Sequence, residues 1–152
     1  MKDVRASTFR VPGLVGGQPI RRLVVVLGDQ LDERAGALHD FDSNADAIFM
    51  AEVRGESRIS TKMRTALFLA AMRHFAQQQV DSGRRVAYVR LDDPDNCHDL
   101  LGEIVRATTM LRPQRVVMVE PGEWRLRDGV TRLALPCPVE MRDDRRLSLI
   151  HI

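Results

Sequence analysis

Acidic residues that directly follow short apolar runs are the part of this sequence best suited to chemistry. Seven carboxylates come after the ends of four such runs: Asp29, Glu52, Glu56, Asp92, Asp93, Glu120 and Glu123. Ionised carboxylates only accept hydrogen bonds, so they suit ligands rich in N–H and hydroxyl donors, such as a pterin, a lumazine or a ribityl chain. Three carboxylate oxygens at close range could instead hold Mg²⁺. Acids in these places are also often helix caps or solvated loop residues, so the residue types leave all three readings open.

The segment Gly28-Asp29-Gln30, together with Glu52 and Glu56, is the candidate binding site. A dinucleotide or P-loop site would need a glycine-rich turn whose backbone N–H groups meet phosphate. The chain contains neither GxGxxG nor GxxxxGK[ST], and Asp29 occupies the turn. A carboxylate there would repel pyrophosphate by about 1 kcal/mol or more. We therefore expect a donor-bearing ligand here rather than a phosphate.

No catalytic residue and no metal ligand are predicted. His39 and His98 have no cysteine or second histidine at zinc-ligand spacing, and no serine lies in a GxSxG motif. A rival reading is a metal-dependent, phosphoacceptor-type α/β domain in which Asp29 and Glu52 hold Mg²⁺. That chemistry requires two carboxylates after the first strand and a lysine after the last, whereas the chain offers one acid and no such lysine. An interaction module without a ligand is a further alternative.

Five apolar, β-branched runs predict the strands that position these residues: 23–27, 45–51, 85–91, 115–119 and 139–141. Such runs are typical of a parallel sheet covered on both faces. Segments with helical spacing predict helices over about 61–82, 97–112 and 124–133, the second with Asn96 as its N-cap. Gly83 suits the left-handed position that ends the first of these helices.

The alternation of strands and helices predicts an α/β fold: a doubly wound, five-stranded parallel sheet in the order 3-2-1-4-5, Rossmann-like, with helices on both faces. Ligands on such sheets bind beyond the carboxyl ends of the strands, near the topological switch point. This fold would bring the seven acids to one edge of the sheet.

Composition places the chain among ordinary globular proteins. Its 152 residues are 44% hydrophobic and carry a net charge of +2, which is too near neutral to argue for nucleic-acid binding by bulk charge. No apolar run approaches the roughly 20 residues that span a bilayer, and no signal peptide is evident. The two cysteines, Cys97 and Cys137, are expected to be free thiols. We expect a cytoplasmic protein that does not contact membranes.

The predicted domain organisation is a single α/β domain over 22–146. Residues 1–21 contain several glycines and no apolar period, and are expected to form a flexible leader. The final segment, 147–152, can be read back into the codons CTG-TCT-CTT-ATA-CAC-ATC, the end sequence of a transposase used to prepare sequencing libraries. We therefore expect this tail to be non-native.

Five motifs in order resemble the bacterial cryptochrome and photolyase-related family, in particular the iron–sulfur-containing cryptochromes and prokaryotic (6-4) photolyases. The resemblance extends over about residues 22–145. The motifs are Leu27-Gly-Asp-Gln-Leu31, Ala51-Glu-Val53 with Glu56, Ala66-Leu-Phe-Leu-Ala-Ala-Met-Arg-His-Phe75, Leu91-Asp-Asp93 with Asn96, and Glu120-Pro-Gly-Glu-Trp-Arg125.

This resemblance implies an antenna domain that binds 6,7-dimethyl-8-ribityllumazine near Gly28, Asp29, Gln30, Glu52 and Glu56. In the family, FAD and a four-cysteine [4Fe–4S] cluster lie in a larger helical domain, which would follow in cis and is missing from this chain. Any contact with DNA would be made through that missing domain. The resemblance thus implies a truncated protein whose parent performs light-dependent DNA repair or photoreception, and a fragment that is inactive alone.

Overall fold

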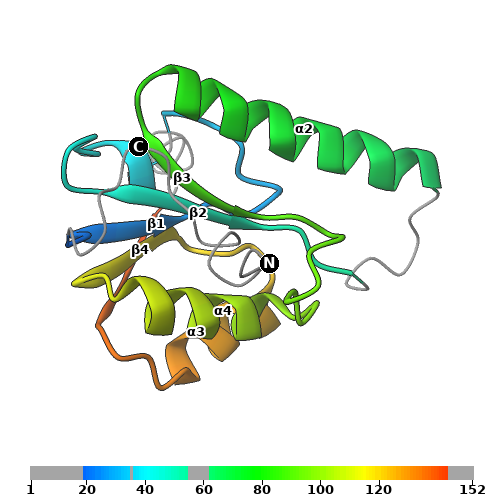
Figure 1. Ribbon diagram of the computed structural model, residues 1–152. Coiled ribbons are helices and arrows are strands. Elements are labelled where there is room, and N and C mark those ends of the chain that lie inside the picture. The colour runs from blue at the N-terminus through cyan, green and yellow to red at the C-terminus, as the bar shows by residue number, and fades with distance from the viewer. Residues whose placement is uncertain (1–18, 35, 55–61, 144–152) are drawn as a thin grey trace, which may run out of the picture.

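A five-stranded, all-parallel sheet forms the centre of the protein (Figure 1). The computed structural model describes residues 19–34, 36–54 and 62–143. Along the chain the elements are β1 (Arg22–Val25), the 3-10 turn η1 (Gly36–Leu38), β2 (Ala47–Ala51), α2 (Lys62–Asp81), β3 (Arg85–Val89), α3 (Leu100–Leu111), β4 (Arg115–Val119), α4 (Trp124–Arg132) and β5 (Val139–Arg142). The predicted tail 147–152 and the site residue Glu56 lie outside the described residues.

The strand order is β3-β2-β1-β4-β5, which confirms the predicted doubly wound topology. In register, Val24 of β1 lies beside Ile48 of β2 on one side and Val117 of β4 on the other. The chain moves outward from β1 to β3 and then returns to β4 on the opposite side of β1. The topological switch point therefore lies between β1 and β4.

Two apolar layers cover the two faces of the sheet. On one face α3 and α4 pack over Leu23, Phe49 and Met118, and on the other α2 and η1 pack over Val24 and Ile48. Figure 1 shows α2 on one side of the strands and α3 with α4 on the other. β2 is buried along its whole length, as expected of a central strand covered on both faces.

Helix ends follow the predicted chemistry at one site and depart from it at another. Gly83, with a φ of 87°, ends α2 as predicted. The prediction of Asn96 as the N-cap of α3 is wrong, because Asp99 holds that position and accepts a hydrogen bond from the backbone N–H of Gly102 at 3.1 Å. Asn96 is buried and donates to the carbonyls of Glu52 (2.6 Å) and Arg90 (3.0 Å).

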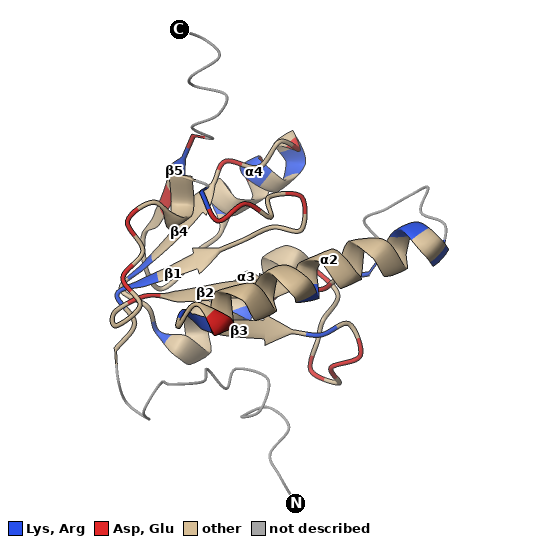
Figure 2. Ribbon diagram, turned by 90° about the horizontal axis from the view of Figure 1, so that it is seen from above, with Lys and Arg blue, Asp and Glu red and all other residues tan. Residues whose placement is uncertain are grey.

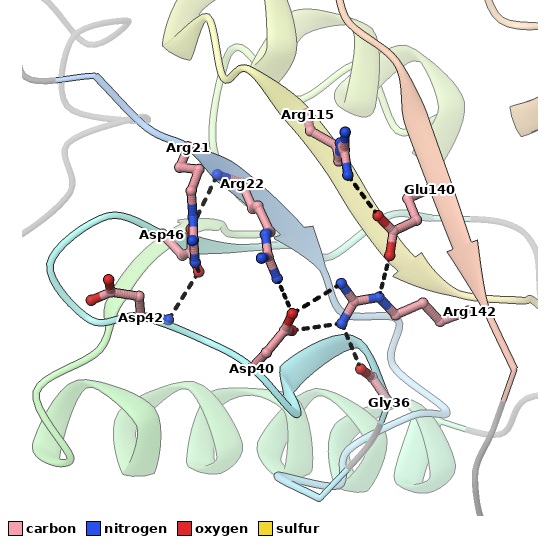
Figure 3. A network of polar contacts seen from close by, with 9 residues as sticks. All are labelled: Arg21, Arg22, Gly36, Asp40, Asp42, Asp46, Arg115, Glu140 and Arg142. Atoms are coloured by element: carbon pink, nitrogen blue, oxygen red, sulfur yellow. Dashed lines mark hydrogen bonds and ion pairs between the residues drawn. The ribbon is translucent and has the colours of Figure 1, made fainter.

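The folded domain begins before Arg22. Ile20 is fully buried, and its carbonyl accepts a hydrogen bond from Gln114 at 2.9 Å. Arg21 forms a two-pronged ion pair with the buried carboxylate of Asp46, at 3.0 and 2.9 Å (Figure 3). Ile20 and Arg21 therefore belong to the domain and not to the predicted leader over 1–21.

A chain of ion pairs links β5 to β1 and to the loop after η1 (Figure 3). Arg142 of β5 bonds Asp40 at 2.7 Å and Glu140 at 2.5 Å. Arg22 also contacts Asp40, and Arg115 bonds Glu140 at 2.9 Å. These contacts connect β1, the first strand along the chain, to β5, the last.

Candidate functional site

The loop after β1 forms an open depression of about 350 Å³ at the carboxyl edge of the sheet. Its lining residues are Gly28, Asp29, Gln30, Leu31, Asp32 and Arg34. Three of these six are residues that the sequence predicted for the site. The volume lies at the lower end of the range typical of small-molecule sites. Because Leu31 supplies the only large apolar side chain of this lining, the surface is mostly polar.

Gln30 fixes this loop at the switch point of the sheet. Its side-chain amide lies 3.4 Å from the carbonyl oxygens of both Val119 and Glu120, at the end of β4. A backbone hydrogen bond from Gln30 to the carbonyl of Leu27, at 2.9 Å, closes the turn. The depression therefore lies at the carboxyl ends of β1 and β4, which is the usual ligand position in open α/β sheets.

Asp29, Asp32 and Arg34 supply the charges of the depression. Asp29 is exposed and has no ion-pair partner among the described residues. Arg34 lies 3.8 Å from Asp32, and its side chain is 87% exposed. The backbone N–H of Arg34 also donates to Asp32 at 2.9 Å. Asp29 is thus an acceptor that a ligand could use without first breaking an internal contact.

α2 lies directly against the turn at Gly28. A Cβ atom at this position would lie 2.3 Å from Cζ of Phe68 and 3.1 Å from Sδ of Met72. Phe68 is 49% exposed, so its ring covers the turn on one side and meets solvent on the other. The close contact sets the position of α2 relative to the depression.

Glu52 lies at the end of β2, where the sequence placed it, but its carboxylate is directed into the protein. It receives a two-pronged ion pair from Arg73 of α2, at 2.7 and 2.9 Å. It also accepts hydrogen bonds from the Tyr88 hydroxyl and from the backbone N–H of Leu91, the latter at 2.7 Å. The side chain is fully buried and does not line the depression. Glu52 therefore joins α2, β2 and β3, and its oxygens are already bonded within the protein.

The charges around Glu52 are held firmly by these contacts. Burial raises the pKa of Glu52, but the hydrogen bonds from Arg73, Tyr88 and Leu91 outweigh it and lower the pKa on balance. Burial and the neighbouring Glu52 carboxylate raise the pKa of Tyr88 well above its usual range. Glu52 is thus ionised and Tyr88 is neutral at physiological pH, which suits an internal hydrogen bond and not proton transfer.

Two comparisons identify the family. The family model described as "Deoxyribodipyrimidine photo-lyase-related protein" matches residues 24–149 of this chain. The chain belongs to this photolyase-related family. A "(6-4) photolyase" from Agrobacterium fabrum (strain C58) is 40% identical over 134 residues. That alignment covers 86% of this chain but only 26% of the relative, so the chain spans about a quarter of that relative's length.

Two of the four remaining acids described at this edge, Glu120 and Asp92, are paired with arginines. Glu120 bonds Arg127 at 2.6 Å, and Asp92 lies 3.5 Å from Arg90. Glu123 holds the N-cap position of α4 but makes no side-chain capping bond. Within 19–34, 36–54 and 62–143, no group of three or more histidine, cysteine or acidic residues is arranged to hold a metal ion. The predicted site thus divides into Gly28, Asp29 and Gln30 at the depression and a separate, internally bonded Glu52.

Sequence reasoning missed the residues that complete this edge: Asp32, Arg34, Arg73, Tyr88 and Asn96. The sequence carried no clear signal for Arg73, because α2 carries other charged and polar residues, among them Arg64 and His74. Its partner could not be identified from spacing either, since Glu52 is 21 residues away. None of the described helices is long and apolar enough to cross a membrane.

Proposed function

We propose that this chain is the antenna-chromophore-binding part of a photolyase-related protein, and that the depression at Gly28, Asp29 and Gln30 takes a ribityllumazine. The observation that carries the proposal is an open, mostly polar depression at the switch point, lined in part by Gly28, Asp29 and Gln30, which the sequence marks for a donor-bearing ligand. Family membership supports it in that the matching family is described as photolyase-related. A lumazine held here would absorb light and pass the excitation energy onward.

The residues of the depression fit such a ligand. Asp29 and Asp32 offer carboxylate acceptors for the hydroxyl groups of a ribityl chain. Arg34 offers guanidinium donors for ring carbonyls, and its side chain is free enough in solvent to adjust to a ligand. The ring would have little apolar surface to bury beyond Leu31 and the neighbouring Phe68. We therefore expect hydrogen bonds to provide most of the affinity.

Asp29, and not Glu52, is the carboxylate that we assign to ligand contact. Glu52 would have to give up Arg73, Tyr88 or the Leu91 N–H to bind a ligand donor. Asp29 would lose only water. We assign to Glu52 the indirect role of holding α2 against the loop after β1, and the predicted contact of Glu56 stays a prediction.

The activity of the whole protein is part of the same proposal. We propose that the longer parent carries FAD and a [4Fe–4S] cluster outside this chain and performs light-dependent DNA repair or photoreception. The relative named as a (6-4) photolyase supports this. The chain alone should show no light-driven repair of DNA lesions.

Titration of the chain with 6,7-dimethyl-8-ribityllumazine, followed by ligand fluorescence, tests the antenna assignment. We expect saturable binding, and Asp29→Ala should raise the Kd about tenfold or more, because a charge-assisted hydrogen bond contributes roughly 1.5–3 kcal/mol. Asp81→Ala is the matched control, since Asp81 is exposed at the opposite end of α2 and bonds Gln77 only locally.

Three results would count against the proposal. Absence of saturable lumazine binding would remove the antenna assignment. An unchanged Kd in Asp29→Ala would move the ligand away from the depression. Calorimetric binding of Mg²⁺ that Asp29→Ala abolishes would favour the metal-dependent alternative.

A further inference from the structure

The first half of α2 presents large apolar side chains to solvent. Met63 is 74% exposed, Leu67 is 65% exposed and Phe68 is 49% exposed. Figures 1 and 2 both show the first turns of α2 extending past the carboxyl ends of the strands. Exposed apolar residues on an ordered helix are a candidate contact surface for another protein segment.

Met63 and Leu67 lie on the side of α2 that faces away from the sheet, whereas Phe68 lies on the inner side and contacts the turn at Gly28. Met72, Phe75, Ala76 and Gln79 are buried and define the side that packs on the sheet. Met63, Leu67, Ala70 and His74 recur at intervals of four, three and four residues, so they share a different face of the helix. All four are exposed. We call Met63, Leu67 and Ala70 the outer stripe.

α2 changes character along its length. In its second half the outer face carries Gln77 and Gln78, as expected of a helix that covers a sheet and meets water. In its first half the outer face carries Met63, Leu67 and Ala70, with Lys62 and Arg64 on either side of them. The apolar part of the outer face is therefore confined to the first half of α2.

We infer that the outer stripe is the docking surface for the remainder of a longer photolyase-related chain, the part that corresponds to the rest of the Agrobacterium relative. This chain accounts for 26% of that relative, so almost three quarters of such a protein lies outside it. The inference rests on the proposed function in one respect, namely that this chain is part of a longer protein.

The position of the stripe supports this occupant. The first turns of α2 lie beside Gly28, through the contact of Phe68, and so at the same edge as the depression. A domain docked on the outer stripe would therefore approach the carboxyl edge of the sheet, where the proposed antenna ligand lies. Ala66, Ala70 and Ala71 are small, so a partner helix could pack closely against α2.

Cysteine labelling of the full-length protein encoded by the gene tests the inference. Leu67→Cys and Gln78→Cys are each introduced after Cys97→Ser and Cys137→Ser remove the native thiols, and the rate of maleimide reaction is measured. The two positions share the outer face of α2, eleven residues apart. In the full-length protein, Leu67→Cys should react at least about tenfold more slowly than in the 152-residue chain, because covered residues react only after local opening. Gln78→Cys should react equally fast in both.

Each other outcome overturns the inference. Equal labelling of Leu67→Cys in both proteins would show an uncovered stripe. Slow labelling in the 152-residue chain, together with a dimer in sedimentation analysis, would assign the stripe to a second copy. A gene that encodes nothing beyond this chain would remove the proposed occupant. The labelling does not depend on lumazine, so protection of Leu67→Cys without lumazine binding would reject the antenna proposal and leave this one standing.

Discussion

Asp29 and Glu52 are both carboxylates that follow a buried strand, yet they meet different donors. Asp29 is exposed at the depression, whereas Glu52 is fully buried and bonded to Arg73, Tyr88 and a backbone N–H. The sequence predicted that both would lie at the carboxyl edge, and they do. It could not distinguish their roles, because the donors of Glu52 come from α2, from β3 and from the residues after β3, and long-range side-chain pairing leaves no local pattern.

Removal of Arg73 should lower the free energy of unfolding, because Glu52 is a buried charge. In Arg73→Ala the buried Glu52 keeps only two of its donors. We therefore expect the free energy of unfolding to fall by about 3 kcal/mol. This is the low end for a broken buried pair, because Arg73 is partly exposed. Arg73→Lys should recover part of the loss, since it keeps the charge but not the two-pronged geometry. Urea denaturation measures both.

Lys62→Ala on the same helix is the control for Arg73→Ala. Lys62 is exposed, and its removal should change the free energy of unfolding by less than about 0.5 kcal/mol. If Arg73→Ala were equally mild, Glu52 would be solvated in solution and available to a ligand after all.

At the scale of elements, one glycine sets how α2 meets the loop after β1. Phe68 and Met72 occupy the space that a Cβ at position 28 would need. The sequence predicted the helix and the turn, but it indicated Gly28 only as a site residue. The sequence could not predict that α2 packs against this glycine, because Gly28 and Phe68 are 40 positions apart.

Gly28→Ala should therefore destabilise the protein through α2. We expect a loss of about 1 kcal/mol, the low end for overpacking, because the clashing atoms belong to a half-exposed ring that can shift. In a Phe68→Ala background the same substitution should cost less by at least about 0.5 kcal/mol, because the clashing ring is gone and the two sites are coupled. Thermal or urea unfolding of the four proteins gives the coupling energy. Additive effects would mean that Phe68 does not rest on Gly28 in solution.

The start of α3 shows how element boundaries escape sequence reasoning. Asn96 and Asp99 are both good N-caps, and the prediction favoured the earlier one. The structure uses Asn96 to satisfy the carbonyls of Glu52 and Arg90 and leaves the cap to Asp99. His98 between them has a φ of 59°, so the chain turns before the helix begins. The carbonyls of Glu52 and Arg90 require hydrogen-bond donors, and this long-range requirement decided between the two possible N-caps.

At the scale of the whole molecule, the sheet order followed from the sequence because the signals were periodic and consistent. Buried runs predicted five strands, and the right-handed crossover rule left few arrangements. The two apolar layers confirm that arrangement. The distribution of charge was less predictable. Arginines pair with many of the acids, as in Arg21–Asp46 and Arg106–Glu103, and neither arginine was a site candidate.

These pairs should make the protein sensitive to acid. Hydrogen bonds from Arg142 and Arg22 hold the pKa of Asp40 well below its usual range, and for Glu52, Asp46 and Glu103 arginine contacts outweigh burial and lower the pKa. A lowered pKa means that the unfolded chain binds protons at a higher pH than the folded protein. The contribution is therefore complete above the ordinary carboxylate pKa of about 4 and is lost as the pH falls below it.

The free energy of unfolding in urea should thus be flat from pH 7 to about pH 5 and should decrease steadily below about pH 4. In Asp46→Asn the decrease should be shallower, because one of the shifted groups is absent. A stability that rose on acidification would show that these pairs do not form in solution.

The ion-pair chain through Arg142 also bears on how the sheet avoids self-association. β5 is an edge strand of four residues, and its outer row of backbone N–H and C=O groups could template a strand from another molecule. Glu140 and Arg142 alternate along it with Val139 and Met141, so any incoming strand would meet charged side chains on one face. Because Asp40 and Arg115 hold those charges in place, the same contacts that fix β5 also disfavour its pairing with a strand of another molecule.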